Sequence, residues 1–110
     1  MTGLQILVLV IADSRRDDVV DALMSLDLIS GFTMTPAMGF SAQHSQFSVR
    51  EQVEGYRTFA RFEILLDATT LEPVLETLAD AAGSESSRYW VAEAPVSGDL
   101  QHRHRPAEDR

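Results

Sequence analysis

The order of the periodic segments constrains the fold of this chain more than any other feature of its sequence. Residues 4–12 are an almost unbroken run of Leu, Ile and Val, as expected for a strand covered on both faces. A helical pattern of apolar residues follows and continues to about residue 28. The later segments predict strand, strand, helix and strand, over residues 31–41, 56–66, 70–82 and 89–92.

Local signals refine these elements. Ser14 and Asp17 have the spacing of a capping box, and Thr69 or Thr70 is expected to cap the second helix before Gly83 ends it. Pro36 lacks a backbone donor and therefore indicates an edge strand, a bulge or an interrupted pairing. The spacing of apolar residues predicts that the first helix buries Val20, Leu23, Met24 and Leu28.

The order strand–helix–strand–strand–helix–strand is the ferredoxin-like arrangement, an α+β sandwich with both helices on one face of the sheet. The other face is not cleanly polar, because Phe59 and Leu65, together with Tyr89 or Trp90, keep it partly apolar. Such a face usually marks an interface, and closed self-association is the default. We expect one domain over residues 1–96 and a polar, partly disordered tail over residues 97–110, with at most a short strand near residues 96–100.

Composition excludes several classes of function. The 110 residues carry a net charge of −8, which argues against nucleic acid and anionic membrane surfaces as partners. The chain has no cysteine, and all nine basic residues are arginine, so thiolate and Schiff-base chemistry are excluded. The apolar run of residues 4–11 is too short for membrane insertion, and we expect a cytoplasmic protein.

No catalytic signature is present. The serines lack a nucleophile-elbow motif, and the three histidines lie in a polar loop and in the tail rather than beside a readable carboxylate. We therefore expect that the protein is not an enzyme.

Residues 40–56 form a long polar excursion between two predicted strands. A connection of this length in a compact domain is either functional or disordered, and both outcomes place it on the surface. One interpretation is a partner-binding loop, and the alternative is a mobile hairpin tip. The side chains expected to contact a partner are His44, Arg50, Glu51, Gln52 and Glu54.

Two ligand sites are compatible with the sequence. Gly39 would allow close approach of a ligand to the backbone, and Arg57 and Arg88 open their strands at one end, where both guanidinium groups could bind a phosphate. The alternative is that they are ordinary strand-end arginines. His102 and His104, with His44, are candidate ligands of a divalent metal ion, against the alternative of a solvated tail.

The segment Gly39-Phe40-Ser41-Ala42-Gln43 is similar to the opening of the T-loop in the PII signalling superfamily. The resemblance covers roughly residues 4–100. The chain resembles one PII-like family more closely, a family of unknown function that is often encoded beside heavy-metal efflux systems. The segments that carry this closer resemblance are SGFTMTPAMGFS, SVREQVEGYRTFARFEILL, RYWV and PVSGDL.

This resemblance implies a homotrimer with effector sites between subunits, in which Phe40 and Gln43 join Gly39, Arg57 and Arg88. It also implies a signalling protein whose loop responds to a small ligand such as an adenine nucleotide and acts on a protein target, for example a membrane transporter in metal efflux or stress. Ala42 replaces an arginine of the T-loop pattern, and Ser84–Arg88 replace the usual phosphate-binding loop. The alternative is a trimeric divalent-metal-binding module similar to the CutA family, using His44, His102 and His104.

Overall fold

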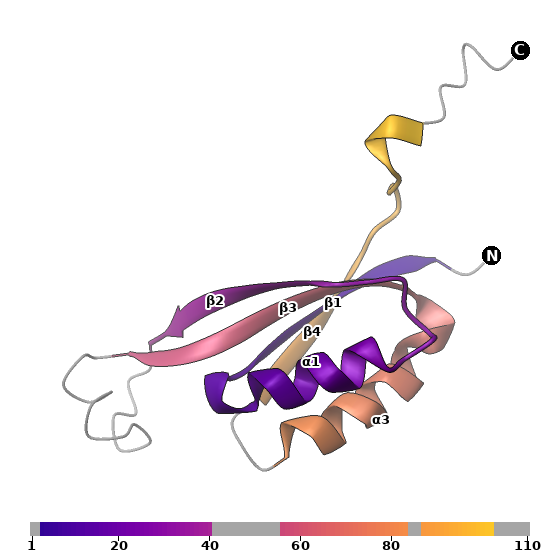
Figure 1. Ribbon diagram of the computed structural model, residues 1–110. Helices are drawn as coiled ribbons and strands as arrows, with labels where there is room; N and C mark the ends of the chain where they lie inside the picture. The colour runs from indigo at the N-terminus through magenta and orange to yellow at the C-terminus, as the bar shows by residue number, and fades with distance from the viewer. Residues whose placement is uncertain (1–2, 41–55, 84–86, 103–110) are drawn as a thin grey trace, which may run out of the picture.

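Figure 1 shows the computed structural model of the chain, which describes residues 3–40, 56–83 and 87–102. Two helices and four strands follow the predicted order, with short 3-10 turns between some of them. The strands are β1 (Leu4–Ala12), β2 (Thr33–Gly39), β3 (Arg57–Asp67) and β4 (Ser87–Glu93). The helices are α1 (Arg16–Met24) and α3 (Leu71–Ala82), and the 3-10 turns are η1 (Asp13–Arg15), η3 (Ala68–Thr70) and η4 (Leu100–His102).

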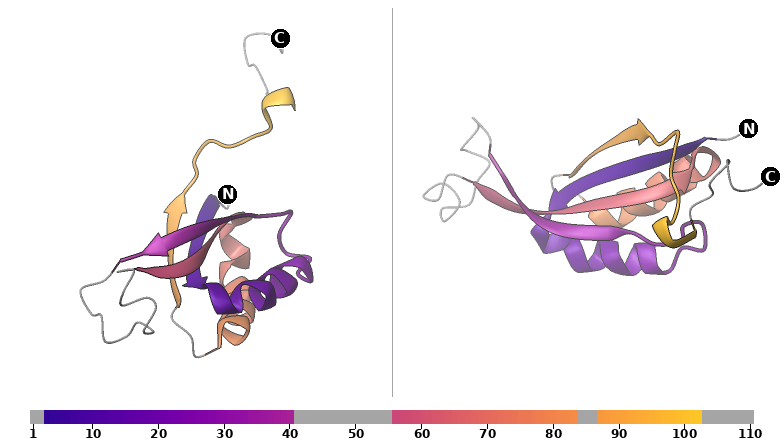
Figure 2. Two further views of the ribbon diagram at one scale, coloured as in Figure 1. Left: turned by 60° about the vertical axis from the view of Figure 1, so that its left-hand side comes forward. Right: turned by 90° about the horizontal axis from the view of Figure 1, so that it is seen from above.

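The strands form one antiparallel sheet in the order β2-β3-β1-β4, and both helices lie on one face of it (Figures 1 and 2). The α+β arrangement predicted from the sequence is confirmed. The edge position indicated by Pro36 is also confirmed, because β2 is an outer strand with β3 as its only neighbour among the described strands.

The core lies between the sheet and the helices. Alternation along β3 points Ala60, Phe62, Ile64 and Leu66 into it, as predicted, and β1 adds Leu7, Leu9 and Ile11. Phe62 is fully buried, and its ring centroid is 5.9 Å from that of Phe32, which follows the turn before β2. The helices cover one face of β1 only, but Val8 on its other face is buried as well, so the burial predicted for both faces does not come from helices on both sides.

The first helix differs from its prediction. It ends at Met24, and it buries Val19 and Leu23 through i, i+4 spacing, with Val20 partly buried at the border of the apolar stripe. Met24 is one turn beyond Val20 at that border and is 73% exposed, and Leu28 lies after the helix and is also exposed. The predicted burial of both side chains is therefore wrong.

The capping signals were assigned to the wrong side chains. No side-chain cap precedes α1, because the chain enters it through the 3-10 turn η1. Before α3, the carboxylate of Asp67 accepts hydrogen bonds from Thr69 N and Thr69 Oγ1, at 2.9 and 2.8 Å. Asp67 rather than either threonine thus caps this end. Gly83 ends α3 with φ +64°, as predicted.

Beyond β4 the chain leaves the sheet. Residues 94–102 run away from the body on the side opposite the helices (Figures 1 and 2). The short strand expected near residues 96–100 is absent from this described segment, which ends instead in the 3-10 turn η4. None of the described strands lies beside this segment, so it forms no sheet ladder with them.

Candidate functional site at the neck of residues 40–56

The face of the sheet that no helix covers carries both apolar and charged side chains. The register aligns Val10 with Arg61 on one side and with Arg88 on the other, and it aligns Val8 with Glu63 and Trp90. Paired residues in neighbouring strands project to the same face, so these side chains lie together. Trp90, and not Tyr89, therefore belongs to this face, since Tyr89 pairs with the core residue Leu9.

Arg61 spans the central strand on this face. Its guanidinium carbon is 5.9 Å from the centroid of the Trp90 ring, and its Nη2 is 3.1 Å from Glu63 Oε2. Since Arg61 is on β3 and Trp90 is on β4, this contact crosses β1, where Val8 is only 5% exposed although no helix covers it. The Arg61 side chain is held by a cation–π contact and an ion pair, and it covers the apolar middle of the sheet around Val8.

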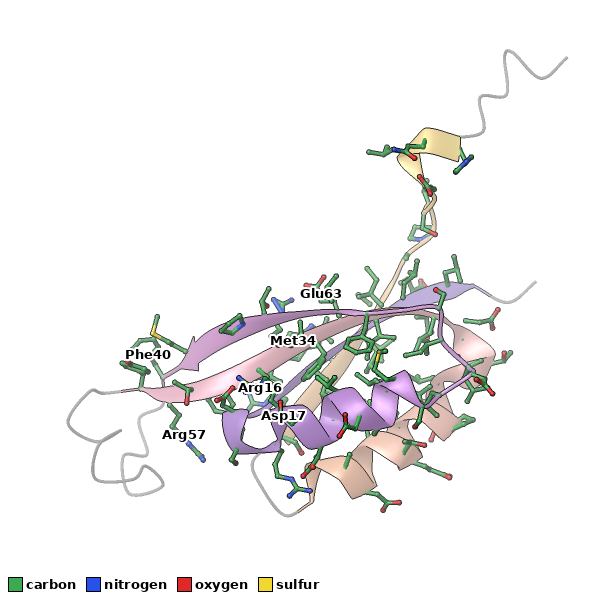
Figure 3. The ribbon with its side chains drawn as sticks, viewed as in Figure 1. Arg16, Asp17, Met34, Phe40, Arg57 and Glu63 are labelled. Atoms are coloured by element: carbon green, nitrogen blue, oxygen red, sulfur yellow. The ribbon has the colours of Figure 1, made fainter. Side chains whose placement is uncertain are left out.

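An aromatic pair joins the two ends of residues 40–56, Phe40 and Tyr56, and this junction is called the neck below. Phe40 follows β2 and Tyr56 precedes β3, and their ring centroids are 5.9 Å apart with the planes tilted by 48°. Tilted aromatic pairs at this separation are favourable beyond simple burial. Figure 3 shows Phe40 at the end of the sheet where the segment begins. The two ends of the predicted partner loop are thus fastened together at the sheet.

Gly39 has a structural explanation at this neck. The Phe59 ring lies against its backbone, and a Cβ at position 39 would overlap the ring edge. On β3, the guanidinium carbon of Arg57 is 5.6 Å from the centroid of the same ring. Phe59 therefore occupies the space beside Gly39 where a ligand is predicted to approach. Gly39, Phe59 and Arg57 pack together as one unit.

Replacing Gly39 with alanine should force the Phe59 ring away from the backbone and lower the free energy of unfolding by about 1–3 kcal/mol. Urea unfolding followed by tryptophan fluorescence at fixed chain concentration measures the change. If the ring is the cause, the double variant Gly39→Ala with Phe59→Ala loses less than the sum of the two single variants. Strict additivity would show that the ring does not determine which residue fits at position 39.

The structure brings the two predicted anion-binding arginines to the same end of the sheet, on strands that are separated by β1. Arg57 pairs with Gly39 at the start of β3, whereas Arg88 pairs with Val10 on the other side of β1. Arg61 lies between them in the register and was not predicted as a site residue. Its alternation with Phe59 was visible in the sequence, but its alignment with Arg88 depends on the pairing of distant strands.

The predicted metal ligands are only partly described. His102 lies in η4 with Nδ1 3.4 Å from Asp99 Oδ2, and its side chain is exposed. Within residues 3–40, 56–83 and 87–102, no three His, Cys, Asp or Glu side chains lie close enough to hold a metal ion. The other predicted ligand and partner residues lie outside the described part of the chain: Gln43, His44, Arg50, Glu51, Gln52, Glu54 and His104.

The fold is similar to that of PII proteins. The crystal structure of Arabidopsis thaliana PII bound to citrate matches with a TM-score of 0.70 at 14% sequence identity, over 93% of this chain and 84% of that chain. This similarity confirms the PII-like fold expected from the sequence. None of the helices in the described residues is both long enough and apolar enough to cross a membrane.

The chain belongs to the DUF3240 family, described as proteins of unknown function, whose sequence model matches residues 1–101. A crystal structure of a DUF3240 family protein from Shewanella baltica OS155 is 33% identical, with a TM-score of 0.75, over 91% of this chain and 99% of that chain. No functionally curated protein matches the sequence.

Proposed function

We propose that this protein is a non-enzymatic, PII-like regulator that assembles as a homotrimer and binds a small anionic ligand. In this proposal the ligand binds at the end of the sheet that carries Arg57 and Arg88, and residues 40–56 act on a protein target such as a membrane transporter. The observation that carries the proposal is the closed neck, which ties this segment to the arginine-bearing end of the sheet. The resemblance to the PII-like family suggests metal efflux or stress as the setting.

The charge distribution favours an anion at this end. Arg61 and Arg88 flank Val10, and Arg57 precedes Arg61 by four residues along β3. Glu63 is engaged with Arg61 and lies further from the neck. The chain as a whole is strongly acidic, so a local concentration of guanidinium groups would attract a phosphate or carboxylate ligand that the rest of the surface repels.

The neck also offers a route from ligand to loop. A ligand that draws Arg57 away from the Phe59 ring would loosen the ring, which packs on Gly39, the residue directly before Phe40. Two arrangements of this unit would differ in the direction in which residues 40–56 leave the sheet. The ligand shifts the equilibrium only to the extent that it binds one arrangement more tightly.

Isothermal titration calorimetry tests the proposal with ATP, ADP, AMP and citrate as anionic probes. We expect at least one of them to bind, and we expect Arg57→Gln and Arg88→Gln each to weaken it about tenfold or more, since hydrogen bonds to charged groups contribute about 1.5–3 kcal/mol. Arg110→Gln is the control for charge, because it removes one arginine from the polar tail of the sequence and not from the end of the sheet that carries Arg57 and Arg88. It should change the affinity less than twofold.

Two outcomes would contradict the proposal. One is the absence of binding by all four anions, and the other is binding that the Arg57 and Arg88 variants leave unchanged. Titration with Cu²⁺, Zn²⁺ and Ni²⁺ examines the metal alternative in the same format. Binding of a metal that is abolished by His102→Ala with His104→Ala would favour that alternative over an anion-responsive regulator.

A further inference from the structure

A groove of about 420 Å³ runs between α3 and the outer strand β4, on the helix side of the sheet. β4 ends the sheet order, and β1 is its neighbour among the described strands (Figure 2). Tyr89 of β4 projects to the helix side, because it pairs with the core residue Leu9, yet it is 54% exposed. The two helices therefore leave the outer strand only partly covered.

The floor of the groove is apolar. Buried side chains of the core, among them Leu78 and Ala82, form its deepest part. Leu75 is only partly buried, and Ala79 is exposed. Leu75, Ala79 and Ala82 follow one another at i, i+4 and i+7 and so form one ridge on the surface of α3. Ridges of this kind pack against a neighbouring helix, and the small alanine side chains let its backbone come close.

Two carboxylates on α3, those of Glu72 and Glu76, border the groove. Four helix positions separate them, which is about 6 Å along the axis. Within the described part of the chain neither carboxylate forms an ion pair or a hydrogen bond, and α3 contains no basic residue. Arg88 borders one end of the groove, but its pairing with Val10 places its side chain on the other face of the sheet. The rim therefore adds negative charge to an apolar floor.

We infer that this groove binds a basic amphipathic helix of a protein partner. The apolar side chains of that helix would pack on Leu75, Ala79 and Tyr89, in the manner of other helices that bind in apolar grooves. Its Lys or Arg side chains would pair with Glu72 and Glu76. The partner helix would thus lie beside α3 and cover the outer strand.

Charge complementarity selects this occupant over a second copy of the chain. The helices α1 and α3 together carry six acidic residues and one arginine, so a second copy offers no basic helix from these two elements. The inference rests on the proposed function and deepens it by giving the protein target a chemistry. Cytoplasmic segments of membrane proteins carry an excess of Lys and Arg, so a transporter is a suitable source of such a helix.

Fluorescence anisotropy tests the groove with a labelled amphipathic peptide of Leu, Ala and Lys, about 18 residues long so that a helix can form. The full chain should bind this peptide, and more weakly as the salt concentration rises. Glu72→Gln with Glu76→Gln should weaken binding about fivefold, since two exposed ion pairs are lost. The matched control is Asp21→Asn with Asp80→Asn, which removes the same charge from the helices at positions that do not line the groove. It should change the affinity less than about twofold.

A second pair of variants tests the shape of the groove. Ala79→Arg places a long cationic side chain in it and should weaken binding about tenfold or more, through steric and charge repulsion. Because Ala79 is exposed on a helix, the variant should retain the fold. Met24→Arg adds the same charge at an exposed site on α1 and should change the affinity less than about twofold.

Four outcomes would overturn the inference. They are the absence of peptide binding, equal losses in the groove variants and their controls, equal binding of a peptide with Glu in place of every Lys, and dissociation of the natural assembly by Ala79→Arg in sedimentation velocity. The last result would mean that a second copy fills the groove. The anion titration with the Arg57 and Arg88 variants is independent of all four, so the groove and the proposed anion response can fail separately.

Discussion

Replacing Phe62 with alanine is expected to lower the free energy of unfolding by about 3–5 kcal/mol. Phe62 is fully buried in the middle of β3, at the centre of the core between the sheet and the helices. It pairs in register with Leu9 on one side and with Met34 on the other, and its ring contacts that of Phe32. Neighbours held by two strands cannot collapse fully into the vacated space, so the cavity penalty adds to the lost burial.

Urea unfolding followed by far-ultraviolet circular dichroism, at one chain concentration for all variants, measures this loss. Met24→Ala is the control, because it also truncates a large apolar side chain but at a site that is 73% exposed, and we expect a change within about 0.5 kcal/mol. A similar loss for both variants would mean that Met24 is buried in solution, as the sequence pattern suggested and the structure does not show.

The elements that could be predicted from the sequence are those with a strict local period. The alternation of β3 assigned Ala60, Phe62 and Ile64 to the core correctly, and Pro36 correctly indicated an outer strand. The face of a helix is harder to define from so short a segment. In α1 the buried stripe is turned slightly from the predicted one, so that Val19 is buried and Met24 is not.

The contacts of the candidate site were harder to predict, because they depend on which strands pair and not on the spacing of apolar residues along one strand. Arg57 was identified because it opens a strand, but its packing on Phe59 and the role of that ring over Gly39 require knowing which residues of β2 and β3 face each other. The contact of Arg61 with Trp90 joins residues 29 positions apart across an intervening strand. No local signal specifies a contact of that kind, because it arises from the sheet order.

The C-terminus of α3 meets the start of α1 where Gly83 ends the helix and Arg15 binds its last turn. Gly83 has φ +64° and ψ −143°, a backbone region that is essentially restricted to glycine. Arg15 packs beside it, and both its Nε and Nη2 donate to Ala81 O, at 3.1 and 2.7 Å. The arginine therefore satisfies a carbonyl at the C-terminus of α3 and ties that end to the start of α1.

Gly83→Ala should lower the free energy of unfolding by about 1–3 kcal/mol, because an alanine cannot adopt this conformation without strain. Contact with neighbours is not the reason, since a Cβ there would lie 3.5 Å from Arg15, at ordinary van der Waals distance. Gly31→Ala is the matched control. Its Cβ would meet no atom within 4 Å, and its φ is outside the left-handed region, so alanine should leave stability unchanged or raise it by up to about 1 kcal/mol. Urea unfolding of both variants distinguishes the two cases by sign, and a loss of equal size at both positions would refute the backbone explanation.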